Sequence, residues 1–379
     1  MNWWSGLGLV VTTVAVLAVS ASAQSADISY LDSKGKLRDD KGTIEGHTFR
    51  GLAFNKGRNA PTRLISADEL VKVEYSRRPD GYDEAMALIA KGELRDGAEG
   101  LLGVLGELKS DRYAWARQEC LFGAADAYYR GGDYDQYNAL TAKLVAEVPE
   151  TRFLPEIELR RADLLTAQGK FDEAVAAYDR ISSEGATNGY APSFLARAAL
   201  GKVEALLAAK KVGEAETTLA AAKAKVSGDA GQARFRAMEA RVALAKEDIS
   251  GARSKFQALV EAGAKEFEKD AGVTRHPILL AAGANGLGDI LFAEEKYPEA
   301  MLEYSKTFAL FASDVSLQSE VAWAMWQFAR CNSRLANSTK EDEQRKVYAD
   351  RHRRMRERVA SEFPRTLGGQ LALKEMGAR

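Results

Sequence analysis

The order of small and large apolar residues along the chain predicts pairs of antiparallel helices. In the stretch "RRADLLTAQGKFDEAVAAYDRI", the small residue Ala162 precedes the large Leu165 by three positions. Gly169 then ends the first helix, because glycine enters the left-handed cap conformation without a Cβ penalty. In the second helix, Ala174 again precedes a large residue, Tyr178. The spacing predicts two helices that touch through their small residues, with the large residues filling the space at the open ends.

The same order recurs along the chain. Four further stretches carry it at the same five positions, beginning at Ala85, Val203, Ala240 and Gly288. In a sixth stretch the first helix fits, but Tyr137 and Thr141 occupy the small and large sites of the second helix. The predicted turns within the pairs lie near six residues: Gly92, Gly132, Gly169, Lys210, Glu247 and Glu295.

This pattern resembles the tetratricopeptide repeat (TPR) and covers roughly residues 80–312, as about six helix pairs. The period departs from the 34 residues of that repeat. The residues that open the second helices are spaced by 40, 37, 41, 37 and 48 positions: Leu94, Tyr134, Phe171, Val212, Ile249 and Tyr297. The phrases "VPETRFLPEIELRRADLL" and "SEFPRTLGGQLALKEM" also resemble periplasmic TPR proteins of the outer-membrane assembly and cell-division type. The resemblance implies a mostly α fold, a TPR-like α-solenoid.

The resemblance also implies that first helices present a concave, partner-binding groove. Eight residues are expected to face it: Phe122, Asp126, Tyr129, Asp163, Arg197, Glu204, Arg241 and Asp289. Chaperone-binding members of the family clamp a terminal carboxylate with Lys and Asn at such sites, and that set is absent here. For Phe122 and Tyr129 two interpretations stay open, since one apolar stripe serves either as partner anchors or as packing against the adjacent repeat.

Residues 27–76 follow a different pattern. Val71, Val73 and Tyr75 alternate with polar residues, and the segment from Asn55 to Gly57 predicts a turn between strands. We expect four or five short strands in a small all-β module that precedes the helices. The stretch resembles the SH3-like or Sm-like modules that precede helical repeats in some bacterial envelope proteins.

Residues 313–379 are predicted to form two C-terminal capping helices. Trp323 and Trp326 lie on the flank of the first, which is either an aromatic binding site or an interior helix covered by its successor. The successor has a basic face, which is either solvated or binds an acidic partner or wall polymer. Its basic residues are Arg345, Lys346, Arg351, Arg353, Arg354, Arg356, Arg358 and Arg365.

Residues 1–23 have the pattern of a signal peptide. An apolar run of 13 residues, Leu7 to Val19, precedes an A-x-A cleavage site that ends at Ala23. The segment lacks Lys and Arg, which departs from the usual pattern, and an uncleaved anchor is the alternative. We expect an exported, periplasmic or extracellular protein with no membrane span after cleavage.

Charge and candidate chemistry narrow the function classes. Lys plus Arg number 53 and Asp plus Glu 54, so no overall charge attracts nucleic acid. Cys120 and Cys331 each lie in an apolar helical pattern and are expected to be separate buried thiols. The three histidines lack metal-ligand spacing, and "GANGLGD" lies inside a predicted helix, not after a strand. We therefore expect that the protein has no catalytic residue, binds no cofactor or metal, and is not an enzyme.

These patterns favour an exported protein–protein interaction scaffold whose partner is another protein or peptide segment. The main alternative is a structural subunit that joins a cell-envelope assembly through the β module. A further alternative is a wall-glycan binder that uses the basic C-terminal face.

Overall fold

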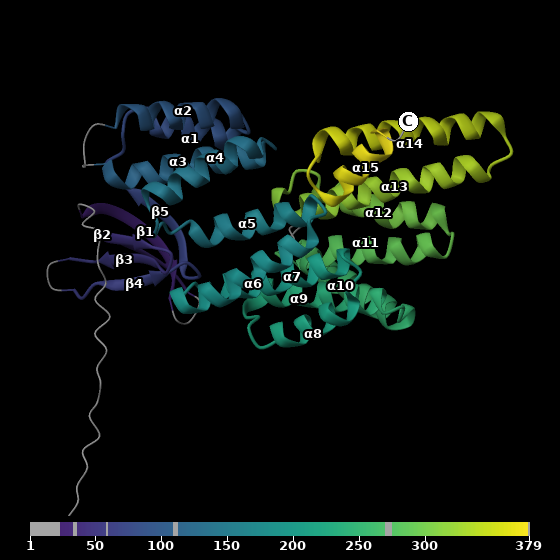
Figure 1. Cartoon of the computed structure of the whole chain (residues 1–379), viewed down its shortest axis with the longest axis horizontal. Coiled ribbons are helices and arrows are strands. Elements are labelled where there is room, and N and C mark those ends of the chain that lie inside the picture. The colour runs from purple at the N-terminus through teal and green to yellow at the C-terminus, as the bar shows by residue number, and fades with distance from the viewer. Residues whose placement is uncertain (1–22, 33–35, 58–59, 109–112, 270–274, 378–379) are drawn as a thin grey trace, which may run out of the picture.

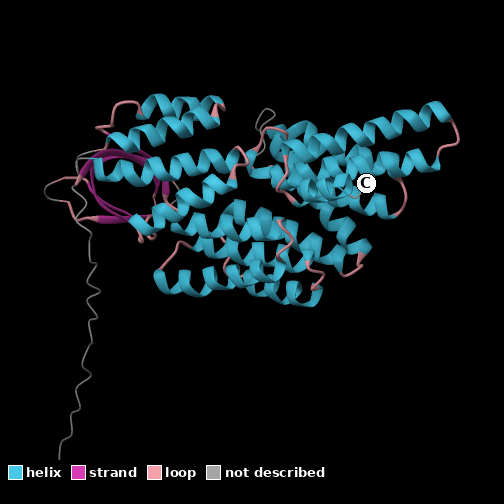
Figure 2. Cartoon of the chain, turned by 45° about the horizontal axis from the view of Figure 1, so that its top comes forward, coloured by secondary structure: helices cyan, strands magenta, loops and turns pink. Residues whose placement is uncertain are grey.

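The computed structural model describes residues 23–32, 36–57, 60–108, 113–269 and 275–377 (Figure 1). The predicted signal peptide lies, but for its last residue, outside these ranges. A small sheet comes first in the chain, and helices follow it to the C-terminus (Figure 2).

The N-terminal sheet has five strands in the order β4-β3-β2-β1-β5, and every neighbouring pair is antiparallel. The strands are β1 (Gln24–Leu31), β2 (Leu37–Thr48), β3 (Gly51–Asn55), β4 (Arg63–Ser66) and β5 (Leu70–Tyr75). Successive side chains of a strand point to opposite faces, so alternate residues fill the core. Ile28, Ile44 and Phe54 are among its fully buried side chains. The small all-β module is therefore present as predicted.

The rest of the chain is an array of helices, each packed against the next. The helices are α1 (Tyr82–Lys91), α2 (Leu94–Glu107), α3 (Ala114–Arg130), α4 (Tyr134–Glu147), α5 (Leu154–Ala167), α6 (Phe171–Asn188), α7 (Pro192–Ala208), α8 (Val212–Ala222), α9 (Gly228–Ala245), α10 (Ile249–Lys269), α11 (Ile278–Ala293), α12 (Tyr297–Phe311), α13 (Gln318–Ser338), α14 (Asp342–Glu362) and α15 (Leu367–Gly377). From α1 to α14 they form seven pairs, and the odd-numbered helix comes first in each. The fold is mostly α, a TPR-like solenoid behind a small sheet.

The turns within the first six pairs lie where the sequence predicts them. Gly92, Gly132 and Gly169 have φ angles of 89°, 81° and 76°. Lys210, Glu247 and Glu295 occupy the corresponding turns, although each carries a side chain, with φ between 61° and 64°. A non-glycine residue in this region costs roughly 1–2 kcal/mol. The packing of the helix pairs therefore stabilises the left-handed turn even where the residue is not glycine.

Helix contacts follow the predicted small and large order. Ala174 and Ala300 are completely buried at the contacts between their helices and the preceding ones. A Cβ atom at Gly201 would lie 2.6 Å from the ring of Tyr178, and one at Gly288 would lie 2.6 Å from the ring of Tyr304. The large tyrosine rings thus fill space that only glycine leaves open on the next or partner helix.

The C-terminal region contains three helices, so the prediction of two was wrong. Two adjacent glycines at the start of α15 weaken the helical signal of that segment. Packing explains them, because a Cβ at Gly368 would lie 2.6 Å from the carbonyl oxygen of Ala322. Helix α13 is an interior helix that packs against α12, α14 and α15, and Trp326 is 7% exposed in its core. For Trp326, the structure favours the interior-helix interpretation.

Candidate partner-binding face

Five of the predicted groove residues occupy the same position in successive first helices. Each directly follows a buried residue of the contact between the two helices of a pair. We call these five residues the inner row: Asp126 of α3, Asp163 of α5, Glu204 of α7, Arg241 of α9 and Asp289 of α11. The face that carries them is called the inner face. Four of its five equivalent positions are carboxylates.

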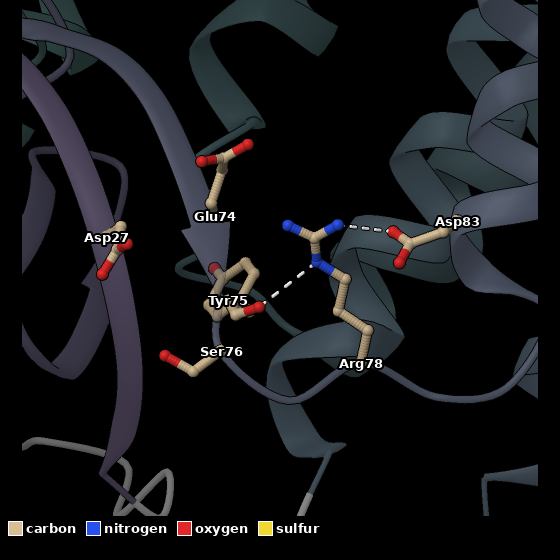
Figure 3. A pocket seen from close by; sticks show the side chains of 6 residues that line it. All are labelled: Asp27, Glu74, Tyr75, Ser76, Arg78 and Asp83. Carbon is tan, nitrogen blue, oxygen red and sulfur yellow. Dashed lines mark hydrogen bonds and ion pairs between the residues drawn. The ribbon is translucent and has the colours of Figure 1, made fainter.

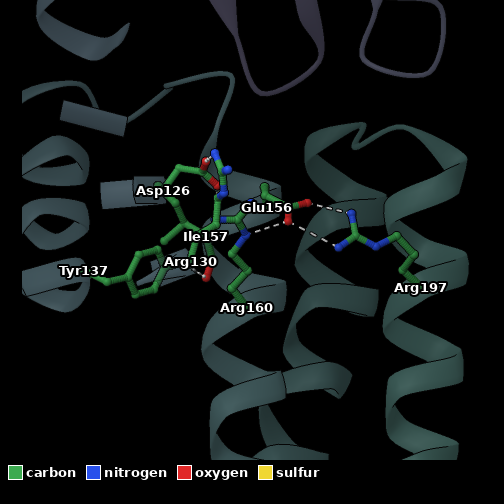
Figure 4. A network of polar contacts seen from close by, with 7 residues as sticks. All are labelled: Asp126, Arg130, Tyr137, Glu156, Ile157, Arg160 and Arg197. Atoms are coloured by element: carbon green, nitrogen blue, oxygen red, sulfur yellow. Dashed lines mark hydrogen bonds and ion pairs between the residues drawn. The ribbon is translucent and has the colours of Figure 1, made fainter. Parts of the chain in front are cut away.

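A network of ion pairs links the first three helices of this face (Figure 4). Arg160 of α5 lies 2.7 Å from Asp126 and 2.8 Å from Glu156. Arg197 of α7 lies 2.6 Å from the second oxygen of Glu156. Burial alone would raise the pKa of Glu156, but Arg197 and Arg160 lower it to about 2. Arg197, predicted to face the groove, is thus held in place by α5, the first helix of the preceding pair.

Asp163 is the least satisfied carboxylate of the inner row. It accepts a hydrogen bond of 2.5 Å from the Tyr178 hydroxyl, and no ion pair to it is found among the described residues. Its side chain reaches solvent, but the neighbouring helices remove part of the water that would stabilise its charge. This desolvation raises the pKa of Asp163 to about 6. The group therefore has free acceptor capacity for a ligand.

Arg241 connects helices that are not sequence neighbours. It lies 3.3 Å from Glu204 of α7 and 3.4 Å from Glu320 of α13. A side chain of α9 can reach α13, two pairs further along, only if the array curves toward this face. The inner row therefore lies on the inside of the curve, as a concave partner-binding face requires.

Asp289 closes the row at its C-terminal end. Its carboxylate accepts hydrogen bonds from Tyr304 at 2.6 Å, Trp323 at 3.1 Å and Gln327 at 2.9 Å. Burial raises the pKa of Asp289, and these donors oppose that shift. Sequence reasoning named Trp323 only as a candidate aromatic site on the flank of its helix, and it missed Gln327. Their contact with Asp289 depends on how α11 and α13 pack, which the local sequence pattern does not encode.

Of the two predicted aromatic anchors, Phe122 packs against the next helix pair and Tyr129 packs against both its own pair and the next. The ring of Phe122 stacks on Phe153, with centroids 3.9 Å apart and an interplanar angle of 8°. Tyr129 meets Tyr134 edge to face at 4.9 Å, and the guanidinium of Arg160 lies 4.6 Å from its ring centroid. Both rings remain partly exposed. The structure thus realises the packing interpretation, and their role as partner anchors stays a prediction.

A pocket of about 440 Å³ lies where β1 and β5 face α1 (Figure 3). Its charged side chains already have partners. Arg78 lies 2.6 Å from Asp83 and donates a hydrogen bond to the carbonyl oxygen of Tyr75. Asp27 and Glu74 form ion pairs with lysines of the sheet. Because the charged residues that line this pocket are already paired within the protein, the inner face is the stronger candidate for a binding site.

The basic face of α14 is largely neutralised within its own helix. Arg345 pairs with Asp342, and Arg353 pairs with Asp350. Arg356 is buried, with 6% of its surface exposed.

Within the described residues, no group of three or more His, Cys, Asp and Glu is arranged to hold a metal ion. Nor does any described helix combine the length and apolar character needed to cross a bilayer.

No family model and no curated protein matches the chain. Its fold is similar to those of three solved structures with TPR or TPR-like repeats. A kinesin light chain with nearly identical TPR-like repeats from Podosopora anserina has a TM-score of 0.34 and 17% identity, covering 53% of this chain and 94% of that one. BtubC (BKLC) from P. vanneervenii has a TM-score of 0.29 and 15% identity, covering 74% and 91% of the two chains.

The third is the TPR domain of P58(IPK), with a TM-score of 0.21 and 12% identity. The match covers 78% of this chain and 97% of that domain. No functional conclusion follows from likenesses at these scores.

Proposed function

We propose that the chain is an exported scaffold that binds a segment of another protein along its inner face. The observation that carries the proposal is the inner row, in which five equivalent positions on a curved array present charged side chains beside buried apolar ones. Repeat arrays of this kind bind through such extended concave surfaces. Asp163 and Glu204 are exposed there and retain acceptor capacity. Export rests on the signal-peptide pattern of residues 1–23.

The partner's contribution is inferred from the chemistry of the face. Charged side chains arranged along a surface fix register and select partners more than they add affinity. With four carboxylates in the inner row, the partner should bring hydrogen-bond donors or cationic side chains to Asp163 and Glu204. The proposal includes no cofactor and no catalytic step.

A capture experiment tests the proposal. The mature chain is immobilised beside a double variant, Asp163→Asn/Glu204→Gln, and bound proteins are identified by mass spectrometry. The matched control, Asp172→Asn/Glu216→Gln, removes the same charges from the exposed second helices α6 and α8. The inner-face variant should lose the partner while the control retains it. Equal capture by all three proteins would refute binding at the inner face.

A second candidate is a structural subunit of an envelope assembly. It is favoured by exposed apolar side chains on the β module, since Leu64 and Val71 on its two edge strands are 51% and 58% exposed. Edge strands with apolar side chains pair readily with other chains. We also retain the proposal that the module is SH3-like or Sm-like. Self-association in light scattering at micromolar concentration would favour this candidate over the scaffold.

A further inference from the structure

The β module contacts the helical array at two places that are far apart in the sequence. At the first, the ring of Tyr75, the last residue of β5, stacks on Trp115 of α3. The centroids are 3.7 Å apart and the planes differ by 12°. The Tyr75 hydroxyl donates a hydrogen bond of 3.2 Å to Glu119, one turn further along α3. The module is thereby fixed to the second helix pair.

At the second place, the loop between β2 and β3 and the turn before β5 meet the connection between α6 and α7. The Arg50 guanidinium donates a hydrogen bond of 2.8 Å to the carbonyl oxygen of Asn188. Asp68 accepts hydrogen bonds from the backbone and the hydroxyl of Ser193. Phe49 packs on Tyr190 with ring centroids 5.5 Å apart. The module is thus also fixed to the boundary between the third and fourth pairs.

The residue that ends α6 is adapted to this contact. Gly189 has a φ of 77°, in the left-handed region. A Cβ atom at this position would lie 3.2 Å from Nε of Arg50. Glycine at this position therefore has two roles: it caps α6, and its missing side chain leaves room for the side chain of Arg50.

The turn between α4 and α5, which lies between the two places in the sequence, is bound to the first place. Arg152, in the turn between α4 and α5, donates hydrogen bonds of 2.8 and 2.9 Å to the two carboxylate oxygens of Glu119. In a solenoid each repeat otherwise contacts only its neighbours, so curvature accumulates from nearest-neighbour contacts. A module that holds the second pair and the third-to-fourth boundary together adds a constraint between these pairs beyond the contacts that their own helices make.

We propose that the β module is a brace that fixes the angle between the second and fourth helix pairs. The brace spans the helices that carry Asp126, Asp163 and Glu204, so it sets the spacing of three of the five inner-row residues. Only this consequence for partner binding rests on the proposed function; the brace itself does not.

The first test uses the full mature chain and the triple variant Phe49→Ala/Arg50→Ala/Asp68→Ala. The variant removes the side-chain contacts of the second place and leaves the Tyr75–Trp115 stack intact, so only the second place is lost. We expect amide-exchange protection in residues 185–197 to fall by about tenfold or more, with a changed small-angle scattering profile. The control Lys72→Gln/Glu74→Gln removes an ion pair of the module that does not touch the array, and should match the parent.

The second test restores the brace covalently. In a Phe49→Ala/Arg50→Cys/Asp68→Ala/Asn188→Cys variant, which lacks the native contacts of the second place, a short bismaleimide should return exchange and scattering to the parent values. Cys120 and Cys331 will not interfere, because both are buried and desolvation raises the pKa of each thiol to about 12. A linker within the module, between Lys72→Cys and Glu74→Cys, should change nothing. The brace is overturned if linked and unlinked proteins exchange and scatter alike.

Discussion

At the residue scale, the fold depends on small side chains at the contacts between helices. Ala174 has no exposed surface, and its helix carries the fully buried Tyr178 four residues later. The order of small and large residues is a short-range signal, and it was enough to locate the helix pairs and their turns. It could not identify the partners of the inner-row residues. The pairing of Arg160 with Asp126 depends on how two separate pairs are oriented, which no local spacing encodes.

Replacing Ala174 with Leu should therefore overpack the contact between α5 and α6. We expect the free energy of unfolding to fall by about 1–3 kcal/mol, because the added methylenes force neighbouring side chains from their rotamers. Thermal or urea unfolding measures the change. Ala176, in the same helix, is exposed, so Ala176→Leu is the control and should cost under about 0.5 kcal/mol. Superimposable curves for all three proteins would mean that the repeat register is misplaced.

At the element scale, the junction between the sheet and α3 contains a histidine that the structure holds in its neutral form. Burial, together with the nearby Arg152, lowers the pKa of His47 from its ordinary 6.5 to about 3. Its Nε2 lies 3.4 Å from the Tyr75 hydroxyl, and its Nδ1 is buried without a hydrogen-bond partner. The positive charge of Arg152 adds to the effect of burial, because it disfavours a second positive charge on the ring.

This arrangement predicts a pH-dependent stability. Because the folded pKa of His47 is depressed, the unfolded chain binds the proton more readily. The contribution is complete above pH 6.5 and is lost progressively as the pH falls toward 3, by at most about 1.4 kcal/mol per pH unit. Asp163, with a raised pKa of about 6, gives a slope of opposite sign between pH 4 and 6.

The difference between the parent and a His47→Gln variant isolates the histidine, since Asp163 contributes equally to both. Urea unfolding at pH 7.5, 6.5, 5.5 and 5.0 should show the parent losing stability relative to the variant below pH 6.5. Parallel pH profiles for the two proteins would show that His47 is accessible to protons in the folded state.

Sequence reasoning at this scale succeeded for elements with a strong local pattern and failed for those defined by contacts. The five strands and the helix pairs were predictable from alternation and from the small-large order. Helix α15 was not, because Gly368 and Gly369 are present for close approach to other helices and oppose its propensity. Docking of the sheet onto α3 and the α6–α7 connection involves residues more than 40 positions apart, such as Tyr75 and Glu119.

At the scale of the whole molecule, the chain is a curved array whose first helices turn one charged face inward. The contact of Arg241 with Glu320 closes the curve between the fifth and seventh pairs. Asp289 holds Trp323 of α13 against α11 in the same region. The aromatic residues Phe122 and Tyr129, for which the sequence leaves both partner anchoring and packing open, contribute to the contact between the second and third pairs, and their role as anchors stays a prediction. Recognition is therefore expected to centre on Asp163 and Glu204.

Site-specific photo-crosslinking in the cell that makes the protein tests most directly whether the inner face binds the partner. A photoreactive amino acid is placed at Glu204 on the inner face, or at Glu216 on the second helix α8. The two side chains are matched controls, since they are 48% and 51% exposed. We predict a discrete crosslinked partner from position 204 and none from position 216. Equal crosslinking from both positions, or crosslinking from position 216 alone, would contradict the central claim that the inner face binds the partner.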